Sequence, residues 1–441
     1  MLENKVLHAK SAACMKSELD LFSVPPTQSS IIGSHHVLHQ PLSTLTDAGP
    51  VEFFISGTGD EYIDVSDILL QVRCKVLTPD GGNLPNQAVV APENNLLHTL
   101  WAQIDCLLND TVITNSNHTY AHNAYLETLL AFGHDATKTH LQTQFWYRDD
   151  DDVNSANPDH NSGFRVRQEL AAGSRPIDMI GKLHLDFFKQ PKLLINNVSI
   201  KLRFTRNSDA FCLHAANQAT PYKIRLLDVS LLVRKCKINP SVQAAHLLAL
   251  EKTNARYPVK RVVSKIFSEP AGSLAINKEN LFLGELPSRL VVGLLNNTAY
   301  HGSYSENPFN FRHLNTSSIC LHLDGRSIPS QPLRPDFRDN YQCYVRSYQQ
   351  MLEALGKTDS PESNTISLKD YCRGFTLWVF DLTPDQAGDA QHLNTIKHGS
   401  LRLEIHFRRA LQHTVSILAQ GEFDNLIEID KFRNVLVDYA N

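Results

Sequence analysis

The second half of the chain repeats the order of sequence patterns in the first half, and this repeat limits the folds the chain can adopt. In each half, a short apolar segment with a polar turn precedes a helical pattern that ends at a glycine, and three apolar segments follow a polar loop. Five elements in one shared order, at offsets of about 190–220 residues, predict two copies of one domain. The matched pairs are 107–113 with 321–328, 121–133 with 341–356, 181–188 with 373–382, 196–207 with 398–411, and 222–238 with 413–430.

Strand patterns dominate both copies from about residue 50 onward. SIKLRFTR (199–206) alternates apolar and polar residues, which is typical of a strand with one buried face. The segment 222–238 has the pattern of one long strand, and the clearest helical patterns lie at 121–133 and 341–356. Because strands do not alternate with helices, we expect antiparallel sandwiches and not a doubly wound α/β fold. Further strand segments are expected at 51–57, 67–78 and 96–108.

These patterns predict an all-β fold of two jelly rolls that lie side by side. Each jelly roll would be an eight-stranded antiparallel sandwich, with a few helices in long loops. A chain of 441 residues is long enough for two or three domains. We expect an extended N-terminal arm at 1–47, a first jelly roll at 48–250 and a second at 251–441, with the junction near 249–261.

The N-terminal segment 1–47 differs in composition from the rest of the chain. Pro, Ser, Thr and His are frequent in it, and no hydrophobic period persists beyond a possible short helix at about 9–20. Such a segment cannot bury enough apolar surface to fold by itself. We expect an extended arm that docks on another surface, or a partly disordered leader.

Composition excludes several classes of protein. The 42 Lys and Arg residues and 46 Asp and Glu residues give a net charge of −4, which excludes a DNA-condensing protein with a general basic field. The charged N-terminus is not a signal peptide, and no window of 18 apolar residues predicts a transmembrane span. The eight cysteines lie more than 20 residues apart, so zinc-ribbon spacing is absent and we expect reduced, mostly buried thiols.

Two groups of histidines have spacings that could bind a metal. His118 and His122 are four residues apart at the start of the first helical pattern, where a third ligand would complete a zinc site. No Cys, Asp or Glu at a suitable distance supplies that ligand, so we interpret the pair as an ordinary polar start of a helix. His35, His36 and His39 lie in the flexible arm, where only adventitious metal binding is expected. The 20 histidines also raise the hypothesis that assembly depends on pH.

Acidic residues gather at two places. The run Asp149 to Asp152 could hold a hard cation, but the spacing of an EF-hand loop is absent, so we interpret it as a solvated loop. Asp60, Glu61 and Asp64 could supply the paired carboxylates of a glycosidase, but nothing distinguishes them from turn residues. The chain has no P-loop, dinucleotide-binding glycine motif, nucleophile elbow or HExxH motif. We therefore predict a non-enzymatic protein without a catalytic, cofactor or metal site.

Basic residues form three short clusters inside strand patterns. They alternate with apolar residues, so solvated or interfacial strand faces are the first interpretation, and a local phosphate-facing patch is the alternative. The clusters are Arg234 with Lys235 and Lys237, Lys260 with Arg261 and Lys265, and Arg408 with Arg409.

Characteristic segments run through nearly the whole chain. They include LDLFSVPPTQSSI (19–31), GPVEFFISGTGDEYIDVSD (49–67), ENNLLHTLWAQIDCLLNDTVI (93–113), AYLETLLAFG (124–133), and the segments 181–213, 233–242, 279–311, 374–385 and 425–439. In these segments the chain resembles the major capsid proteins of Maverick/Polinton-type elements and of their adintovirus relatives. The motifs are structural and have no catalytic content, and their order and coverage make the resemblance specific.

The resemblance implies a double jelly-roll capsid protein. Three copies would form a homotrimer with six jelly rolls, a pseudo-hexameric capsomer that tiles an icosahedral shell around double-stranded DNA. Neighbouring capsomers and a penton protein would be its partners, and the virion capsid its location, with synthesis in the host cytoplasm and assembly in the nucleus. With its net charge of −4, the chain is not expected to bind DNA tightly itself.

The same resemblance suggests a role for the arm. Leu21, Phe22 and Val24 precede Pro25 and Pro26, which stiffen an extended segment. We expect the arm to run along the base of the capsomer and to tie neighbours or minor proteins together.

Two other functions fit paired jelly rolls. One is a carbohydrate-active or glycan-binding protein, and the other is a host scaffold protein domesticated from a virus-like element. A trimeric mass favours the capsid protein, whereas a monomer or dimer that binds sugar favours the first alternative. Genomic neighbours such as a packaging ATPase and a maturation protease would distinguish an intact element from a domesticated gene.

Overall fold

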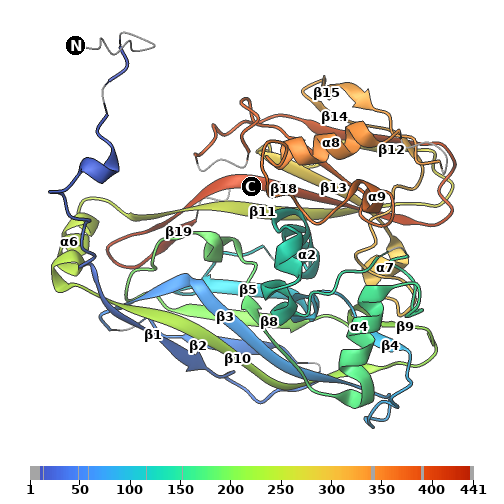
Figure 1. The fold of residues 1–441 in the computed structure, drawn as a ribbon, viewed down its shortest axis with the longest axis horizontal. Coiled ribbons are helices and arrows are strands. Elements are labelled where there is room, and N and C mark those ends of the chain that lie inside the picture. Colours follow the sequence, from blue (N-terminus) through green and yellow to red (C-terminus); the bar gives the residue numbers. More distant parts are fainter. Residues whose placement is uncertain are drawn as a thin grey trace.

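Two β sandwiches of antiparallel strands make up most of the molecule (Figure 1). The second sandwich lies beside the first, and helices from long loops pack between and around them. This architecture confirms the predicted all-β fold of two jelly rolls. The computed structural model describes residues 10–12, 14–47, 49–57, 59–115, 117–150, 152–338, 343–388 and 392–437.

The first sandwich consists of two four-stranded sheets. One has the strand order β1-β10-β3-β7 and the other the order β2-β8-β5-β6. A separate two-stranded ribbon, β4 (Val90–Pro92) with β9 (Leu213–Ala215), lies at one end. The sandwich strands are β1 (Ile31–His39), β2 (Val51–Ile55), β3 (Glu61–Leu77), β5 (Trp101–Leu108), β6 (Thr111–Val112), β7 (Ile177–Lys182), β8 (Ile200–Arg206) and β10 (Lys223–Ile238).

The second sandwich repeats this topology strand for strand. Its sheets have the orders β11-β18-β13-β16 and β12-β17-β14-β15, with β19 added beside β18. In both sandwiches the first, eighth, third and sixth strands form one sheet, and the second, seventh, fourth and fifth form the other, as in a jelly roll. The strands are β11 (Ala255–Glu269), β12 (Ala275–Lys278), β13 (Arg289–Asn296), β14 (Thr316–Leu323), β15 (Arg326–Leu333), β16 (Leu377–Asp381), β17 (Leu401–Phe407), β18 (Val415–Ile429) and β19 (Val435–Val437).

The repeat inferred from the sequence corresponds to real strands and helices. The pair 107–113 and 321–328 falls on the hairpins β5-β6 and β14-β15, and the two helical patterns fall on α2 (Tyr120–Ala131) and α8 (Val345–Ala354). Each helix follows the fifth strand of its sandwich and precedes the sixth. The other helices are α1 (Leu96–Thr99), α3 (His134–Thr137), α4 (Ser162–Ala171), α5 (Asp209–Cys212), α6 (Pro240–Leu250), α7 (Asn297–His301) and α9 (Leu368–Tyr371), with 3₁₀ turns at Ser17–Leu19, His140–Gln144, Ala172–Ser174 and Asp186–Lys189.

The alternation of apolar and polar residues predicted strands correctly where one face of the strand is solvated. Along β8 (Ile200–Arg206), buried residues alternate with more exposed ones, as predicted for 199–206. The long strand predicted at 222–238 is β10. Both strands pair with neighbours far away in sequence, β8 with β2 and β5, and β10 with β1 and β3.

Several predicted boundaries were wrong. The segment 96–108 begins with the short helix α1, and the polar residue Glu61, placed in a turn, starts β3. The apolar segment 181–188, which the repeat predicted as one element, overlaps only the end of β7, and β7 begins at Ile177. Gly133 has φ −84°, so it does not form the left-handed helix cap that Gly356 forms with φ 65°.

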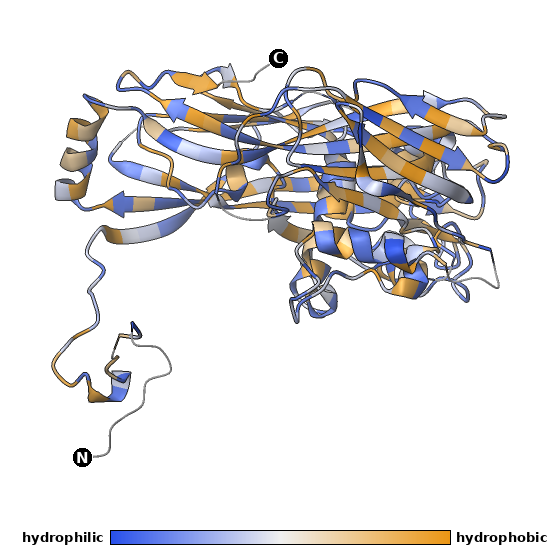
Figure 2. Cartoon of the chain, turned by 90° about the horizontal axis from the view of Figure 1, so that it is seen from above, coloured by the Kyte–Doolittle hydropathy of each residue, from blue (hydrophilic) through white to orange (hydrophobic). Residues whose placement is uncertain are grey.

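The N-terminal arm is shorter than predicted. Residues 31–39 form β1, an edge strand that pairs antiparallel with β10 and belongs to the first sandwich. The helix predicted at about 9–20 is reduced, in the described part of that segment, to a 3₁₀ turn at Ser17–Leu19. Residues 14–30 remain as an arm that stands away from the body of the molecule (Figure 2). At the predicted junction between the domains, α6 ends at Leu250 and β11 starts at Ala255.

In one sheet of the second sandwich, β11-β18-β13-β16, the strands β13 and β16 and the first half of β18 are buried on both faces. Along β13, Val292 and Leu294 lie in the core of the second sandwich. Val291 and Leu295, on the opposite face, lie in a larger hydrophobic cluster that is continuous with the core of the first sandwich. Burial on both faces explains why β13 and β16 are continuous apolar runs without alternation.

The cysteines are free thiols, in agreement with the expectation from their spacing. Cys74, Cys106, Cys212, Cys236 and Cys320 are buried. In the described part of the chain, no helix is long and apolar enough to cross a membrane.

Candidate functional site

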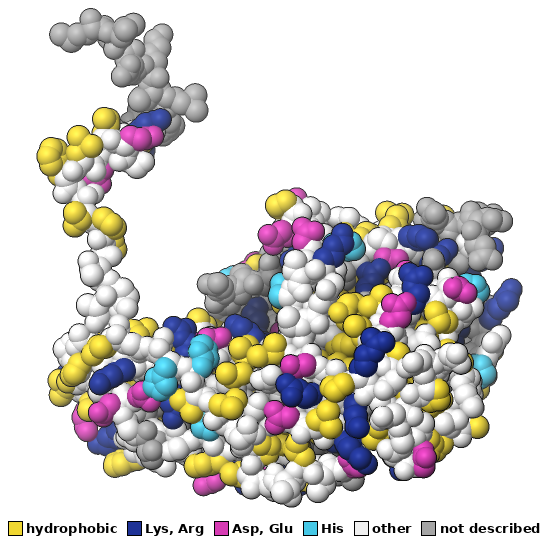
Figure 3. Space-filling model, turned by 60° about the horizontal axis from the view of Figure 1, so that its bottom comes forward, with side chains coloured by type: hydrophobic (Ala, Val, Ile, Leu, Met, Phe, Trp, Pro, Cys, Tyr) yellow, Lys and Arg dark blue, Asp and Glu magenta, His cyan; other side chains and the backbone are white. Residues whose placement is uncertain are grey.

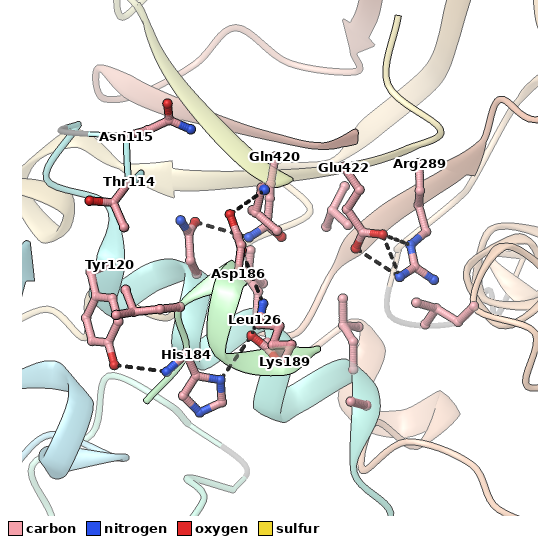
Figure 4. A pocket seen from close by; sticks show the side chains of 18 of the residues that line it. Thr114, Asn115, Tyr120, Leu126, His184, Asp186, Lys189, Arg289, Gln420 and Glu422 are labelled. Atoms are coloured by element: carbon pink, nitrogen blue, oxygen red, sulfur yellow. Dashed lines mark hydrogen bonds and ion pairs between the residues drawn. The ribbon is translucent and has the colours of Figure 1, made fainter. Parts of the chain in front are cut away.

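The seam between the two sandwiches contains a polar cavity of about 360 Å³ (Figure 4). The first half contributes α2, the loop after β6 and the segment that follows β7. The second half contributes residues of β11, β13 and β18 and the segment after α8. Any group bound here would contact both halves of the chain.

Ion pairs between neighbouring side chains occupy the charged groups of this cavity. Lys189 Nζ lies 2.8 Å from Glu127 Oε2 and 3.5 Å from Asp186 Oδ1, and His184 Nδ1 lies 3.0 Å from Glu127 Oε2. Arg289 donates two hydrogen bonds, of 3.0 and 2.9 Å, to the carboxylate of Glu422. Each of these carboxylates thus has a cation beside it, and Lys357, which also lines the cavity, donates a hydrogen bond of 3.5 Å to the carbonyl oxygen of Ala131.

The pKa values of the cavity residues follow from these pairs. Desolvation alone would raise the pKa of Glu127, but Lys189 and His184 outweigh it and hold the pKa well below its usual range. Desolvation raises the pKa of Asp186, an effect that Lys189 only partly offsets. Desolvation would lower the pKa of Lys189, but Glu127 and Asp186 reverse the direction and raise it. The cluster is therefore a stable set of ion pairs and not an acid or base poised for proton transfer.

Hydrogen bonds across the same seam join the two halves. Asp186 Oδ2 accepts a hydrogen bond of 2.9 Å from the backbone N–H of Val262. Asn117 Nδ2 donates to the carbonyl oxygen of Ser264 at 3.0 Å, and Gln420 Nε2 donates to Asn123 Oδ1 at 3.1 Å. Because hydrogen bonds are directional, these contacts set the angle at which the sandwiches meet.

Sequence reasoning did not identify the seam residues. Their signal was present in β18, where Gln420 interrupts an otherwise apolar run, and in β11, where Ser264 follows two valines. A polar residue inside a strand that is buried on both faces needs a hydrogen-bond partner. This pattern could have indicated a polar contact between the halves, although not its partner.

Asp149 forms a second polar junction between the halves, and its prediction as part of a solvated loop was wrong. Asp149 and Arg167 are both 1% exposed, with 2.6 Å between Oδ1 and Nη2. Asn161 Nδ2 also donates to Oδ1 at 2.9 Å, and Asn307 Nδ2, from the second half, donates to Oδ2 at 3.0 Å. Asp151 lies outside the described residues, and Asp152 is exposed. The first residue of the acidic run is thus a structural anion that holds both halves.

His122 lies in an aromatic cluster and is not the polar helix start that was predicted. Its ring contacts Phe211, Tyr300 and Phe309, with centroid distances of 5.3–5.5 Å, and it is 2% exposed. Burial lowers the pKa of His122 to about 4. His118 lies before α2, in a left-handed conformation, so the two imidazoles do not share a helix face. A zinc site on this pair is therefore not formed.

The histidines assigned to the arm belong to the edge strand β1. His35 Nδ1 lies 3.6 Å from Glu61, and His36 Nε2 lies 3.4 Å from Asp67. Both acids belong to β3, which is separated from β1 by β10 in the same sheet. The pKa of His39 is lowered, and the largest cause is the burial of its imidazole. These histidines are therefore held in a sheet and not in a flexible segment.

Members of each basic cluster form ion pairs in or beside the sheets, and Arg408 lies just after the end of β17 and not inside a strand. Arg234 Nη1 lies 3.1 Å from Asp64 Oδ2, and Arg408 Nη2 lies 3.3 Å from Asp336 Oδ2. Arg261 lies 3.7 Å from Glu285. These contacts support the interpretation as strand faces with local ion pairs. Among the described residues, no group of three or more His, Cys, Asp or Glu side chains could hold a metal ion.

The arm residues singled out in the sequence are exposed. Leu21, Phe22 and Val24 are 75%, 96% and 86% exposed. Figure 3 shows apolar side chains along the arm, which projects from the body. Pro25 and Pro26 connect this apolar segment to β1. The structure thus brings the five residues together on one projecting segment, and no residue in the described part of the chain covers Phe22.

Comparison with solved structures identifies the fold. A chain of the Sputnik virophage structure aligns with a TM-score of 0.60, covering 99% of this chain and 95% of that chain at 11% identity. The chain has the double jelly-roll fold. The Faustovirus major capsid protein aligns with a TM-score of 0.57 at 8% identity, covering 93% of this chain and 92% of that one. For the mavirus major capsid protein the TM-score is 0.54 at 11% identity, with coverages of 99% and 97%.

Similarity in sequence extends to an animal protein. An uncharacterized protein of Caenorhabditis elegans is 25% identical over 427 residues, which cover 94% of this double jelly-roll chain and 99% of the nematode protein. No family model matches the chain.

Replacement of Asp149 by Asn should lower the free energy of unfolding by about 3–5 kcal/mol, because Arg167 would stay buried without its counter-charge. Urea denaturation of the full chain measures this difference. Asp159→Asn, at an exposed position of the same loop, is the matched control and should change stability by no more than about 0.5 kcal/mol. Equal stability of the two variants would contradict a structural role for the Asp149 carboxylate.

The lowered pKa of His122 predicts a dependence of stability on pH. Between pH 6.5 and about 4, the unfolded chain binds a proton at His122 that the folded chain does not bind. The stabilisation is therefore present above pH 6.5 and is lost as the pH falls toward 4, by up to about 3 kcal/mol. Denaturation at both pH values should show this loss reduced in His122→Phe and unchanged in the exposed control His160→Phe. An identical pH dependence in both variants would refute the assignment.

Proposed function

We propose that the chain is a major capsid protein whose trimer forms a pseudo-hexameric capsomer of an icosahedral shell. The observation that carries this proposal is the strand-for-strand identity of the two sandwich topologies within one chain. Two similar domains in each of three chains give six similar corners around a threefold axis. The full-length likeness to the mavirus and Faustovirus major capsid proteins supports the same conclusion.

The seam between the sandwiches suits this function. A tile in a shell must keep its six corners at fixed angles, so the two sandwiches of each chain must not move relative to each other. The shared hydrophobic cluster gives the seam its stability, and the directional contacts of Asp186 and Asp149 give it a defined geometry. We propose no catalytic role for the cavity, since each of its carboxylates lies beside a cation.

The context that we propose is a Maverick/Polinton-type element or a related virus with a double-stranded DNA genome. The resemblance of the chain segments to that family supports this context. Neighbouring capsomers and a penton protein would be partners, and the virion capsid would be the location after synthesis in the cytoplasm and assembly in the nucleus. The net charge of −4 argues against tight DNA binding by the chain itself.

A domesticated host scaffold protein is the second candidate function. The full-length likeness to a nematode protein favours it, because that relative is encoded by an animal. Both candidates use the same trimer, and only the first requires a closed shell. A glycan-binding or carbohydrate-active protein has less support, because the carboxylates of the seam cavity are engaged by Lys189 and Arg289.

The purified protein should run as a trimer. Size-exclusion chromatography with light scattering should give about 149 kDa, from three copies of 49.6 kDa, and electron microscopy of that species should show six lobes. A species of 49.6 kDa at micromolar concentration would refute the capsid proposal. A monomer that also binds a sugar in a glycan array would establish the glycan-binding alternative instead.

We also propose that the arm ties neighbouring copies through Leu21, Phe22, Val24, Pro25 and Pro26. Deletion of residues 1–26 should leave the trimer intact and reduce shell formation, as counted by electron microscopy. The deletion spares Gln28, whose side chain bonds to Ile31 at the start of β1. Deletion of residues 1–14 is the control, since it leaves the apolar segment in place. Normal shells from the longer deletion would end the hypothesis of an arm tie.

A further inference from the structure

Helix α6 (Pro240–Leu250) is an apolar helix that the single chain leaves largely uncovered. Its sequence, PSVQAAHLLAL, contains no Asp, Glu, Lys or Arg, yet Leu250 is its one buried residue. Leu247 and Leu248 are 50% and 70% exposed. Because a helix that is apolar all around normally lies inside a protein, α6 has the composition of an element that becomes covered.

An apolar groove of about 510 Å³ lies beside α6. This volume is within the range of roughly 300–1,000 Å³ of clefts that hold a ligand. Its walls come from α6, the start of β11 and the segment 192–195, which belong to both halves of the chain. The apolar wall residues are Ile31, Leu193, Ile195, Ile238, Val242, Ala249, Leu250 and Ala255, together with the aromatic rings of Tyr62 and Tyr257.

The arm supplies apolar side chains that match this groove in kind. Leu19 is 65% exposed, and Leu21, Phe22 and Val24 are still more exposed. The arm begins at the groove itself, since Ser30 and Ile31 line the groove wall. Figures 1 and 2 show α6 and the root of the arm at the same end of the molecule. One end of the chain thus presents both an apolar ligand and an apolar groove.

The geometry of the arm root directs the arm away from its own groove. The side chain of Gln28 accepts a hydrogen bond from the Ile31 N–H at 2.8 Å and donates one to the Ile31 carbonyl at 3.1 Å. Asn239, which caps α6, donates from its backbone N–H to the Ser30 carbonyl at 2.8 Å and from its side chain to the Ser29 carbonyl at 3.1 Å. These bonds fix the direction in which the chain leaves the body.

The prolines extend the arm beyond this fixed root. Pro25 and Pro26 favour an extended conformation, which opposes a reversal of the chain between Phe22 and Gln28. Ser30 is eight positions after Phe22, and an extended chain of eight residues spans about 26 Å. The apolar segment can therefore reach a neighbouring molecule more readily than the groove of its own chain.

Charges at the two surfaces are complementary. Glu18 and Asp20 lie on either side of Leu19, and together with Lys16 they give residues 16–30 of the arm a net charge of −1. At the groove, Lys192 and Arg256 are exposed. Arg256 Nε forms an ion pair with Glu428 Oε1 at a distance of 3.1 Å. An acidic arm segment next to basic residues favours one orientation of docking.

We propose that residues 19–26 of one copy dock in the groove between α6 and β11 of a second copy. This inference rests on the proposed function, since both require contact between copies. Each molecule donates one arm and receives another, so the contact joins two different surfaces. Phe22 fills the groove, and the neighbour's arm covers α6.

A photo-crosslinking experiment on the full chain tests this docking. Benzoylphenylalanine replaces Phe22, which keeps an aromatic ring at the position, and the assembled protein is irradiated. We expect a covalent dimer of twice 49.6 kDa on a denaturing gel, with the crosslink mapped by mass spectrometry to 192–195 or 238–257. A crosslink within one chain, a crosslink to any other surface, or no crosslink in the assembled protein would overturn the proposal.

Two substitutions on α6 form a matched pair for the same experiment. Ala249 and Ala244 are both exposed on α6, but only Ala249 lines the groove. Ala249→Glu should reduce the dimer band on the order of tenfold, because it places an acid against the apolar and acidic arm. Ala244→Glu should leave the band unchanged. An equal effect of the two variants would overturn the proposal.

Size-exclusion chromatography before irradiation distinguishes failure of the docking proposal from failure of the capsid proposal. If the protein forms the expected trimer but Phe22 crosslinks elsewhere, the groove is not the arm's receptor and the capsid function stands. If no trimer forms but the dimer crosslink to α6 and β11 appears, the docking stands and the proposed capsomer is refuted.

Discussion

Burial of one sheet on both of its faces is the constraint on which the rest of the structure depends. The sheet β11-β18-β13-β16 closes the second sandwich with one face and packs toward the first sandwich with the other. Gly293 shows how close this packing is, because a Cβ atom there would lie 2.5 Å from the ring of Phe311. A sheet in this position cannot be exposed without opening both halves, so the two sandwiches stabilise each other.

Apolar burial holds the halves together, but polar contacts determine how they meet. Hydrophobic contact is not directional, and two apolar faces could slide past each other at little cost. The bonds from Asp186 to Val262 and from Asn307 to Asp149 have defined lengths and angles and lie at separate places on the seam. Two such junctions prevent rotation about either one. Rigidity of this kind is what a protein needs when its job is to hold neighbours at fixed angles.

Local sequence patterns predicted the strands whose buried residues recur along the strand itself. They failed where burial or strand pairing depends on residues far away along the chain. The alternation in β8 and the length of β10 were predicted because each reflects burial along a single strand. The burial of Asp149 could not be predicted, because Arg167 and Asn307 are 18 and 158 residues away along the chain. The strand at Ile31–His39 was missed for the same reason, since its pairing with β10 has no local signal. The arm residues were singled out because apolar residues next to two prolines are a local pattern; the structure shows that Leu21, Phe22 and Val24 are exposed, and their role in assembly stays a prediction.

The placement of apolar surface in this molecule favours assembly by contact between unlike surfaces. The arm and α6 are at the same end of the chain, and each presents apolar residues that the single chain leaves exposed. If two copies exchanged arms about a twofold axis, both arms and both grooves would be used and the assembly would stop at a dimer. When each molecule instead gives its arm to one neighbour and receives an arm from another, the contact repeats around a ring or across a lattice. As the proposed capsid tile, the molecule would need this second arrangement, because the rigid body sets the angles while the extended arm makes the connection to the neighbour.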